Sequence, residues 1–322
     1  MTNPAYIMMD GELVRFDDAK VHVLAPAVTY ALAVFEGIRA YWNESDKELY
    51  LFRLDEHLVR LQQSMRLMRF DAEFSVESLR KQIFKIIRAN AQRETIHLRV
   101  MAMVTGAPNV SASGPISLVI TSGHYPSTPW VDRGMDVQVS SWQRVGDTTN
   151  PPRIKATANY ANGRLAMLQA KRDGYDSAIM LTRDGKVAET PVATVFMVRR
   201  GEIVTPSVTE GILESITRDT LIQLAEEQLG RKTIERPIDR TELYSADELF
   251  ACGSGWEITP IASVDRVPIG TEAPGPVTRE LRQIYLDTVH GRSTSHPEWL
   301  TPVWKDAGAP HSRRKAAEAT TV

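Results

Sequence analysis

Apolar and polar residues alternate along residues 95–104. Ile96, Leu98 and Val100 fall on one side, whereas His97 and Arg99 fall on the other. A period of two predicts a β-strand with one buried face, and it places His97 and Arg99 on the same face. In 58–68 and 79–87, by contrast, apolar residues recur every three or four positions, as they do along one face of a helix. This change of period indicates a chain of the mixed α/β class.

Two Asp-Gly dipeptides predict tight hairpins, because both residue types tolerate a positive φ. Asp10-Gly11 separates strands expected at 6–9 and 13–16, and Asp184-Gly185 separates 177–182 from a strand beginning near Val187. Helices are expected from near 55, from near 75, from 159 to about 172 with Asn159 near its N-cap, up to Gly230, and over 277–288.

Residues 123–130 break all periodicity with two prolines, a glycine and two bulky aromatic residues, as a linker does. We therefore expect a small N-terminal domain over 1–122, an interdomain loop over 123–134 and a larger domain over 135–305. Residues 306–322 have the composition of a disordered tail.

Composition narrows the possible functions. A net charge of −2, with Lys and Arg spread along the 322 residues, gives no basic patch for nucleic acid. Cys252 is the only cysteine, which excludes an internal disulfide, and the seven histidines lack metal-site spacing. No apolar run is long enough to span a membrane, and the first residues do not resemble a signal peptide. We expect a soluble, cytoplasmic protein that binds no metal.

Lys155 is the strongest candidate for a catalytic residue. It follows Pro151-Pro152, lies among small residues that allow close approach to its amine, and precedes Tyr160 by five positions. A desolvated lysine is a nucleophile, and a lysine that forms a Schiff base is the usual carrier of pyridoxal phosphate. The alternative is a solvated surface lysine, which is the common case.

Three other features are typical of phosphate binding. Ser215, Ile216 and Thr217 open a helix, where unpaired N–H groups attract anions. The Gly253-Ser254-Gly255 turn follows a strand, and Arg60 offers a guanidinium. Each also has a plain interpretation, as a helix cap, a turn and a solvated helix face. Glu189, at the end of a strand, is suited to keep a pyridine nitrogen protonated, unless it is simply exposed at a sheet edge.

Taken in order, Phe35-Glu36-Gly37-Ile38-Arg39, Arg60, Lys155 with Tyr160, Glu189, Ile216-Thr217-Arg218 and Gly253–Thr259 resemble the class IV aminotransferases that use pyridoxal 5'-phosphate, and most of all the branched-chain amino acid aminotransferases. The resemblance runs from about Tyr6 to Trp304. It implies a two-domain fold type IV enzyme whose larger domain has a mixed, barrel-like β core. It also implies a homodimer or higher homo-oligomer that acts on an amino donor and a 2-oxo acid.

The resemblance also implies roles for individual residues. Lys155 would hold the cofactor as an internal aldimine and move the substrate proton. Tyr160 would contact the phenolic oxygen of the cofactor and Glu189 its pyridine nitrogen, and the phosphate would be bound by Arg60, Ile216, Thr217 and Ser254. The substrate would be bordered by Tyr30, Phe35, Arg39, His97, Arg99, Tyr125, Trp130, Gly255 and Trp256, with Arg99 and Arg39 near a distal carboxylate.

Departures from the branched-chain pattern concern the substrate. His97 stands where a tyrosine is expected to help hold the α-carboxylate, Thr194 replaces an asparagine, and Ser254-Gly255-Trp256 replaces Thr-Ala-Ala. The leading hypothesis is transamination between a branched-chain L-amino acid and 2-oxoglutarate. The alternatives are an (R)-selective amine or D-amino acid transaminase of the same fold and, from another class, a lyase resembling aminodeoxychorismate lyase or a protein that binds the cofactor without catalysis.

Overall fold

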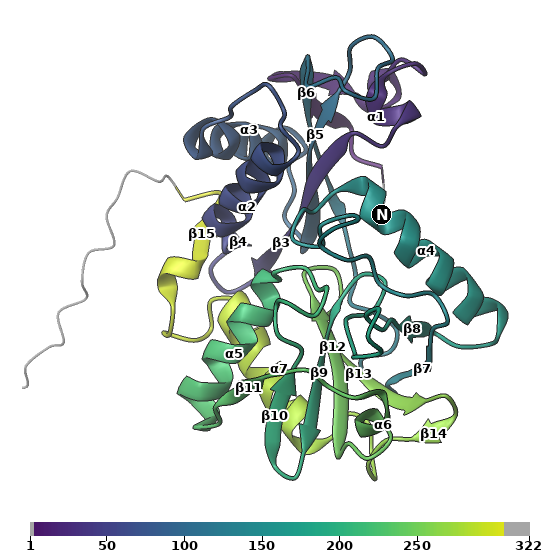
Figure 1. Ribbon diagram of the computed structural model, residues 1–322. Coiled ribbons are helices and arrows are strands. Elements are labelled where there is room, and N and C mark those ends of the chain that lie inside the picture. Colours follow the sequence, from purple (N-terminus) through teal and green to yellow (C-terminus); the bar gives the residue numbers. More distant parts are fainter. Residues whose placement is uncertain (1–2, 306–322) are drawn as a thin grey trace, which may run out of the picture.

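The computed structural model describes residues 3–305, which form two β-sheets with helices packed against them (Figure 1). The first sheet has the order β15-β4-β3-β5-β6-β1-β2, and all its strand pairs are antiparallel. Its strands are β1 (Tyr6–Met9), β2 (Glu12–Arg15), β3 (Ala33–Asn43), β4 (Glu48–Phe52), β5 (Ile96–Val104), β6 (Ile116–His124) and β15 (Leu300–Pro302).

Two helices, α2 (Leu54–Leu67) and α3 (Val76–Ala89), pack against one face of this sheet. Their buried leucines and isoleucines share one apolar cluster with strand residues such as Ile38, Leu98 and Val100. The short helices η1 (Phe16–Asp18) and α1 (Pro26–Thr29) precede β3. The alternation in 95–104 therefore does what it predicted, because β5 buries Leu98 and Val100 in the core and leaves His97 and Arg99 on the other face.

The second sheet has the order β11-β10-β9-β12-β13-β7-β8, with β14 attached to β13, and it mixes parallel and antiparallel pairs. Helices α5 and α7 pack on it, and α4 lies beside β8. The elements are β7 (Met135–Val139), α4 (Thr157–Arg172), β8 (Ser177–Ile179), β9 (Thr194–Arg199), β10 (Glu202–Thr205), α5 (Ile216–Leu229), β11 (Thr233–Glu235), α6 (Arg240–Leu243), β12 (Glu248–Gly253), β13 (Glu257–Val264), β14 (Val267–Pro268), α7 (Pro276–Val289) and η2 (Pro297–Trp299).

Several local predictions are confirmed. Asp10 and Gly11 have φ values of 52° and 88° and join β1 to β2 in an antiparallel hairpin. Ser75 caps α3 by accepting a hydrogen bond from the Ser78 N–H, and Gly230 ends α5 with φ 62°. These are torsion and capping effects of single residues, so the local sequence is enough to predict them.

The start of α4 differs from the prediction. The helix begins at Thr157, two residues before Asn159, and Asn159 is buried inside its first turn. Its side-chain amide donates to the carbonyls of Pro151 and Ile154, each at 3.0 Å. An asparagine that bonds preceding backbone is typical of a helix start, but here it ties down the loop that carries Lys155 instead of capping the helix.

The end of the described chain returns to the first sheet. Strand β15 pairs with β4, and buried Glu48 accepts backbone N–H groups of Val303, Trp304 and Lys305. Residues 300–305 are therefore part of the N-terminal half, within the range expected to form the larger domain. The division at 1–122, 123–134 and 135–305 otherwise stays a prediction, and the tail expected at 306–322 lies outside the described residues.

Candidate active site

A cavity of about 290 Å³ is lined by residues from both halves of the chain. Most of the side chains that the sequence singled out reach it. They are Phe35, Arg60, His97, Arg99, Tyr125, Lys155, Tyr160, Glu189, Ile216, Ser254, Gly255 and Trp256. Residues that are up to 221 positions apart are thus brought to one place by the packing of the two sheets.

Lys155 is fixed by its backbone and keeps its amine in the cavity. Its N–H donates to Ser64 Oγ at 3.2 Å, and its carbonyl accepts the Phe35 N–H at 2.9 Å. Ile154 and Ala156 on either side are buried in the core of the first sheet. Lys155 Nζ donates to Tyr160 Oη at 2.8 Å, and Phe35 lies beside the Tyr160 ring with 5.0 Å between centroids. The solvated-lysine alternative therefore does not describe this residue.

The start of α5 and Arg60 form a site suited to an anion. Ser215 caps the helix by accepting the Arg218 N–H, and the first intrahelical bond runs from Asp219 N to Ser215 O. The amides of Ile216 and Thr217 come before that bond, so they have no partner within the helix. Ser215, Ile216 and Arg60 all line the cavity, and Arg60 Nη1 donates to Glu214 O at 2.6 Å.

Arg60 is not the solvated helix residue that its sequence position allowed. It is 9% exposed, and its Nε and Nη2 donate to the two carboxylate oxygens of fully buried Glu36 at 2.7 and 2.8 Å. His57 Nδ1 lies 2.7 Å from Glu36 Oε2. Burial raises the pKa of Glu36, but Arg60 and His57 outweigh it and hold that pKa well below its usual range. Because the carboxylate is ionised, His57 Nδ1 carries the hydrogen.

Sequence reasoning missed Glu36 and His57 as supports for the site. The available signal was a glutamate in the middle of a strand whose neighbours are otherwise fully buried. A charged residue at such a position needs a partner, which here comes from α2.

Glu189 is buried and is held from two sides. Arg144 Nη2 lies 2.6 Å from its Oε1, and the Leu213 N–H donates to Oε2 at 3.3 Å. Burial raises the pKa of Glu189 above its usual value, although Arg144 and the Leu213 N–H act in the other direction. The alternative of an exposed edge-strand glutamate is wrong, because Glu189 is only 5% exposed. Arg144 was not singled out from the sequence, because nothing local links it to Glu189.

The wall formed by β3 and β5 carries His97 and Arg99. The His97 ring lies against Gly37, where a Cβ atom would come within 2.9 Å of Nε2, and it packs on Tyr125 with 5.2 Å between centroids. Burial, together with the charges of Arg99 and Arg39, lowers the pKa of His97 to about 3, so the ring is neutral near pH 7. Arg99 is exposed, and its guanidinium lies 4.7 Å from the Phe35 ring centroid.

Four predicted site residues do not line the cavity. Arg39 shares a face with His97, but its guanidinium turns away to the carbonyls of Tyr125 (2.9 Å) and Gly255 (3.3 Å) and to Glu257 (3.5 Å). The structure thus gives Arg39 a bracing role and not the expected contact with a distal carboxylate. The other three are Trp130, which packs behind Trp256, Tyr30, which is 45% exposed, and Thr217, which is buried beside Ile216.

Within residues 3–305, no group of three or more His, Cys, Asp or Glu side chains is arranged to bind a metal ion. In the same range, no helix combines the length and apolar character needed to cross a membrane.

Comparison with known proteins identifies the family. The profile of the family described as amino-transferase class IV matches residues 33–264. The probable branched-chain-amino-acid aminotransferase of Aquifex aeolicus is 36% identical over 304 residues, which are 93% of this chain and 97% of that protein.

Solved structures agree with this result. The branched-chain amino acid aminotransferase of Thermobaculum terrenum, solved in its PLP form, is 44% identical with a TM-score of 0.88, over 94% of this chain and 99% of that one. The T.th. enzyme, complexed with N-(5'-phosphopyridoxyl)-L-glutamate, is 34% identical with a TM-score of 0.88, over 94% of this chain and 100% of that one. The chain belongs to the class IV aminotransferases, enzymes that depend on pyridoxal phosphate, and within them it is similar to the branched-chain amino acid aminotransferases.

Proposed function

We propose that this aminotransferase transfers the amino group of a branched-chain L-amino acid to 2-oxoglutarate, with Lys155 as the residue that bonds the cofactor. The observation that carries the proposal is the pairing of Arg99 with Phe35 on the cavity wall. A guanidinium beside an aromatic surface suits both a distal carboxylate and an aliphatic side chain. The names of the similar proteins support the same donor class.

The chemistry of the cavity fits pyridoxal phosphate. The group needs an amine, an anion site and an acidic partner for its pyridine nitrogen. The cavity offers Lys155 Nζ as the amine and Glu189, with its raised pKa, as the acidic partner. The anion site would be built from Arg60, Ser254 and the first amides of α5. When bound, the cofactor supplies an electron sink for the charge that develops at the substrate α-carbon.

Lys155 and Tyr160 would work as a pair. Lys155 Nζ takes the proton from the substrate α-carbon, because it is the amine available in the cavity for general base catalysis. Tyr160 Oη accepts a hydrogen bond from that amine and so restrains its position. Two substrates that use one site in turn predict ping-pong kinetics.

His97 and Trp256 favour a second candidate function. A neutral imidazole attracts a carboxylate less than a cation does, and Trp256 adds a large apolar surface to the wall beside Gly255. Both features suit an amine that lacks a carboxylate. The second candidate is therefore an (R)-selective amine transaminase or a D-amino acid transaminase that uses the same Lys155.

Single half-reactions separate these functions. The purified holoenzyme is mixed separately with L-leucine, L-glutamate, D-alanine and (R)-1-phenylethylamine, and the visible absorbance of the bound cofactor is followed. Fast loss of absorbance with L-leucine and L-glutamate is expected. A response confined to the (R)-amine or to D-alanine would contradict the branched-chain proposal and support the second candidate.

We also propose that the protein works in the cytoplasm as a homodimer or a larger homo-oligomer. Val23, Leu24 and Val28 are 72%, 50% and 58% exposed and lie close together in sequence before β3, which supports a partner surface there. Light scattering tests the assembly, and an active species with the mass of one chain would contradict it.

A further inference from the structure

Two helices meet at the proposed phosphate site, and they come from different halves of the chain. Helix α2 carries Arg60, and helix α5 presents the amides of its first turn. The Arg60 bond to Glu214 O is one direct link between them. A phosphate held from both sides needs a constant distance between these helices, so any second link between them affects the site.

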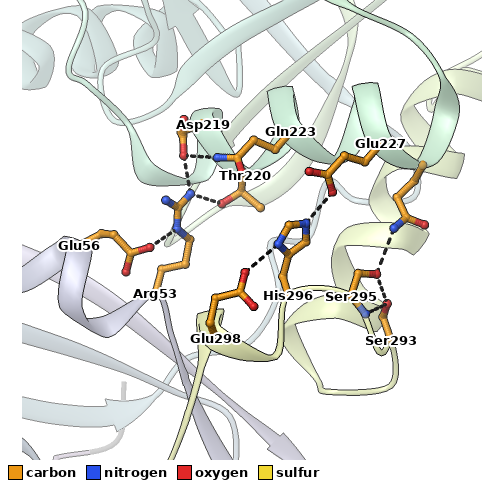
Figure 2. Close-up of polar contacts among 11 residues, drawn as sticks. Arg53, Glu56, Asp219, Thr220, Gln223, Glu227, Ser293, Ser295, His296 and Glu298 are labelled. Atoms are coloured by element: carbon orange, nitrogen blue, oxygen red, sulfur yellow. Dashed lines mark hydrogen bonds and ion pairs between the residues drawn. The ribbon is translucent and has the colours of Figure 1, made fainter.

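Arg53 forms such a second link. It is the N-cap residue of α2, seven positions before Arg60, which is about 10 Å along a helix. Its Nη1 lies 2.6 Å from Asp219 Oδ2 and 3.1 Å from Thr220 Oγ1, both on α5, while its Nε donates to Glu56 at 2.8 Å (Figure 2). Thr220 Oγ1 in turn donates to Ile216 O at 2.9 Å. The contacts of Arg53 therefore reach the residue that opens α5.

The partner of Arg53 has an unfavourable charge for a phosphate site. Asp219 lies in the first turn of α5, where the helix end attracts anions. A free carboxylate in that turn repels a phosphate group. Arg53 pairs with this carboxylate, so it removes the repulsion as well as joining the helices.

The C-terminal segment holds Arg53 from behind. The Arg53 N–H donates to Trp299 O at 2.7 Å, and its guanidinium lies 5.1 Å from the Trp299 ring centroid. His296 stacks on the same ring at 3.7 Å. Its two nitrogens face carboxylates of Glu227 on α5 and Glu298, as Figure 2 shows. Four groups thus converge on the place where α2 meets α5.

We propose that Arg53 is a positioning residue for the phosphate site: it holds the first turn of α5 against α2 and neutralises Asp219, so that Arg60 and the Ile216 amide meet the phosphate together. This inference rests on the phosphate role proposed above for Arg60 and α5. It does not depend on which amino acid the enzyme uses.

The test measures cofactor binding and not turnover. The full chain is freed of cofactor and titrated with pyridoxal 5'-phosphate or with pyridoxal, which lacks the phosphate, while absorbance is followed. Arg53→Met is expected to weaken binding of pyridoxal phosphate by about tenfold, since one charge interaction is lost, and to leave pyridoxal binding unchanged. Arg53→Met with Asp219→Asn is expected to restore much of the loss, because the repelling carboxylate is gone. Inorganic phosphate should compete less well in Arg53→Met than in wild type.

Matched variants separate the possible failures. Arg80→Met removes a guanidinium that pairs with Asp55 of the same helix α2, away from α5, and it should leave both affinities unchanged. Arg53→Lys keeps the charge and covers the case in which Arg53→Met does not fold. If Arg60→Gln lowers the preference for pyridoxal phosphate but Arg53→Met does not, the role of Arg53 is refuted. An equal loss for both ligands without rescue by Asp219→Asn refutes it too. If Arg60→Gln has no effect, the phosphate site itself is misassigned.

Discussion

Glu36 and Arg60 form a two-point ion pair across β3 and α2, with N–O distances of 2.7 and 2.8 Å and with Glu36 fully buried. Two parallel hydrogen bonds fix the plane of a guanidinium as well as its position. Arg60 is therefore held in place by the protein itself, with Nη1 directed to the start of α5.

Replacing Glu36 with Gln should destabilise the protein. Arg60 would keep its charge in a buried place without the compensating carboxylate, and breaking a buried pair in this way costs about 3–5 kcal/mol. Urea unfolding measures the loss. Asp55→Asn, which breaks the surface pair with Arg80, should cost less than about 1 kcal/mol. Equal effects of the two variants would mean that the Glu36–Arg60 pair contributes no more than a surface contact.

Tyr160→Phe should slow the half-reaction with the preferred amino donor by about 10- to 100-fold, because the charged amine of Lys155 loses its hydroxyl partner. Stopped-flow absorbance of the bound cofactor measures the rate. Tyr175→Phe is the matched control, since Tyr175 packs under Arg266 away from the cavity. An unchanged rate in Tyr160→Phe would show that this hydroxyl does not restrain the amine.

Gly37→Ala should alter substrate binding through His97. A Cβ atom at this position would lie 2.9 Å from His97 Nε2, so the ring must shift into the cavity. We expect KM for the amino donor to rise by about tenfold with a smaller change in kcat, because the shift affects the wall and leaves Lys155 in place. Gly146→Ala, whose nearest atom would be 3.9 Å away, should leave KM unchanged. A normal KM in Gly37→Ala would mean that His97 does not contact the substrate.

Stability should fall as pH drops below about 6.5, the usual pKa of histidine. His97 has a folded pKa of about 3, so between these values the unfolded chain binds a proton that the folded protein does not. The unfolded state binds more protons, so stability decreases with falling pH, by roughly 1.4 kcal/mol per unit for one such group. Buried His57, whose pKa is also lowered, adds to this loss. His97→Gln should make the slope of unfolding free energy between pH 4.5 and 6.5 shallower, and an unchanged slope would contradict the assignment.

His296 should act in the opposite direction on the alkaline side. Burial lowers its pKa, but hydrogen bonds with Glu227 and Glu298 outweigh that effect and raise the pKa above its usual value. The stabilising contribution is therefore complete below about pH 6.5 and is lost as pH rises through the higher folded pKa. The melting temperature of wild type should decline above pH 6.5 more than that of His296→Gln. Parallel pH profiles would show that the two contacts do not hold a proton.

Local patterns predicted those features of the site that depend on neighbouring residues. The alternation in 95–104 placed His97 and Arg99 on one face, and β5 confirms it. The five-residue step from Lys155 to Tyr160 spans the start of α4, so their contact follows from local geometry. Arg39 was harder, because its face was evident from the same alternation but the direction of its guanidinium depends on Glu257, which is 218 positions away.

The sequence by itself determined the family, the strand and helix types, and the hairpins at Asp10-Gly11 and after Thr182, because periodicity and backbone torsion are properties of nearby residues. Only the tertiary structure decided which charges are buried together. Glu36 with Arg60, Glu189 with Arg144, and Arg53 with Asp219 each join distant segments. A charged side chain leaves water only where a partner compensates for its lost hydration, and that partner comes into reach only when the sheets and helices pack.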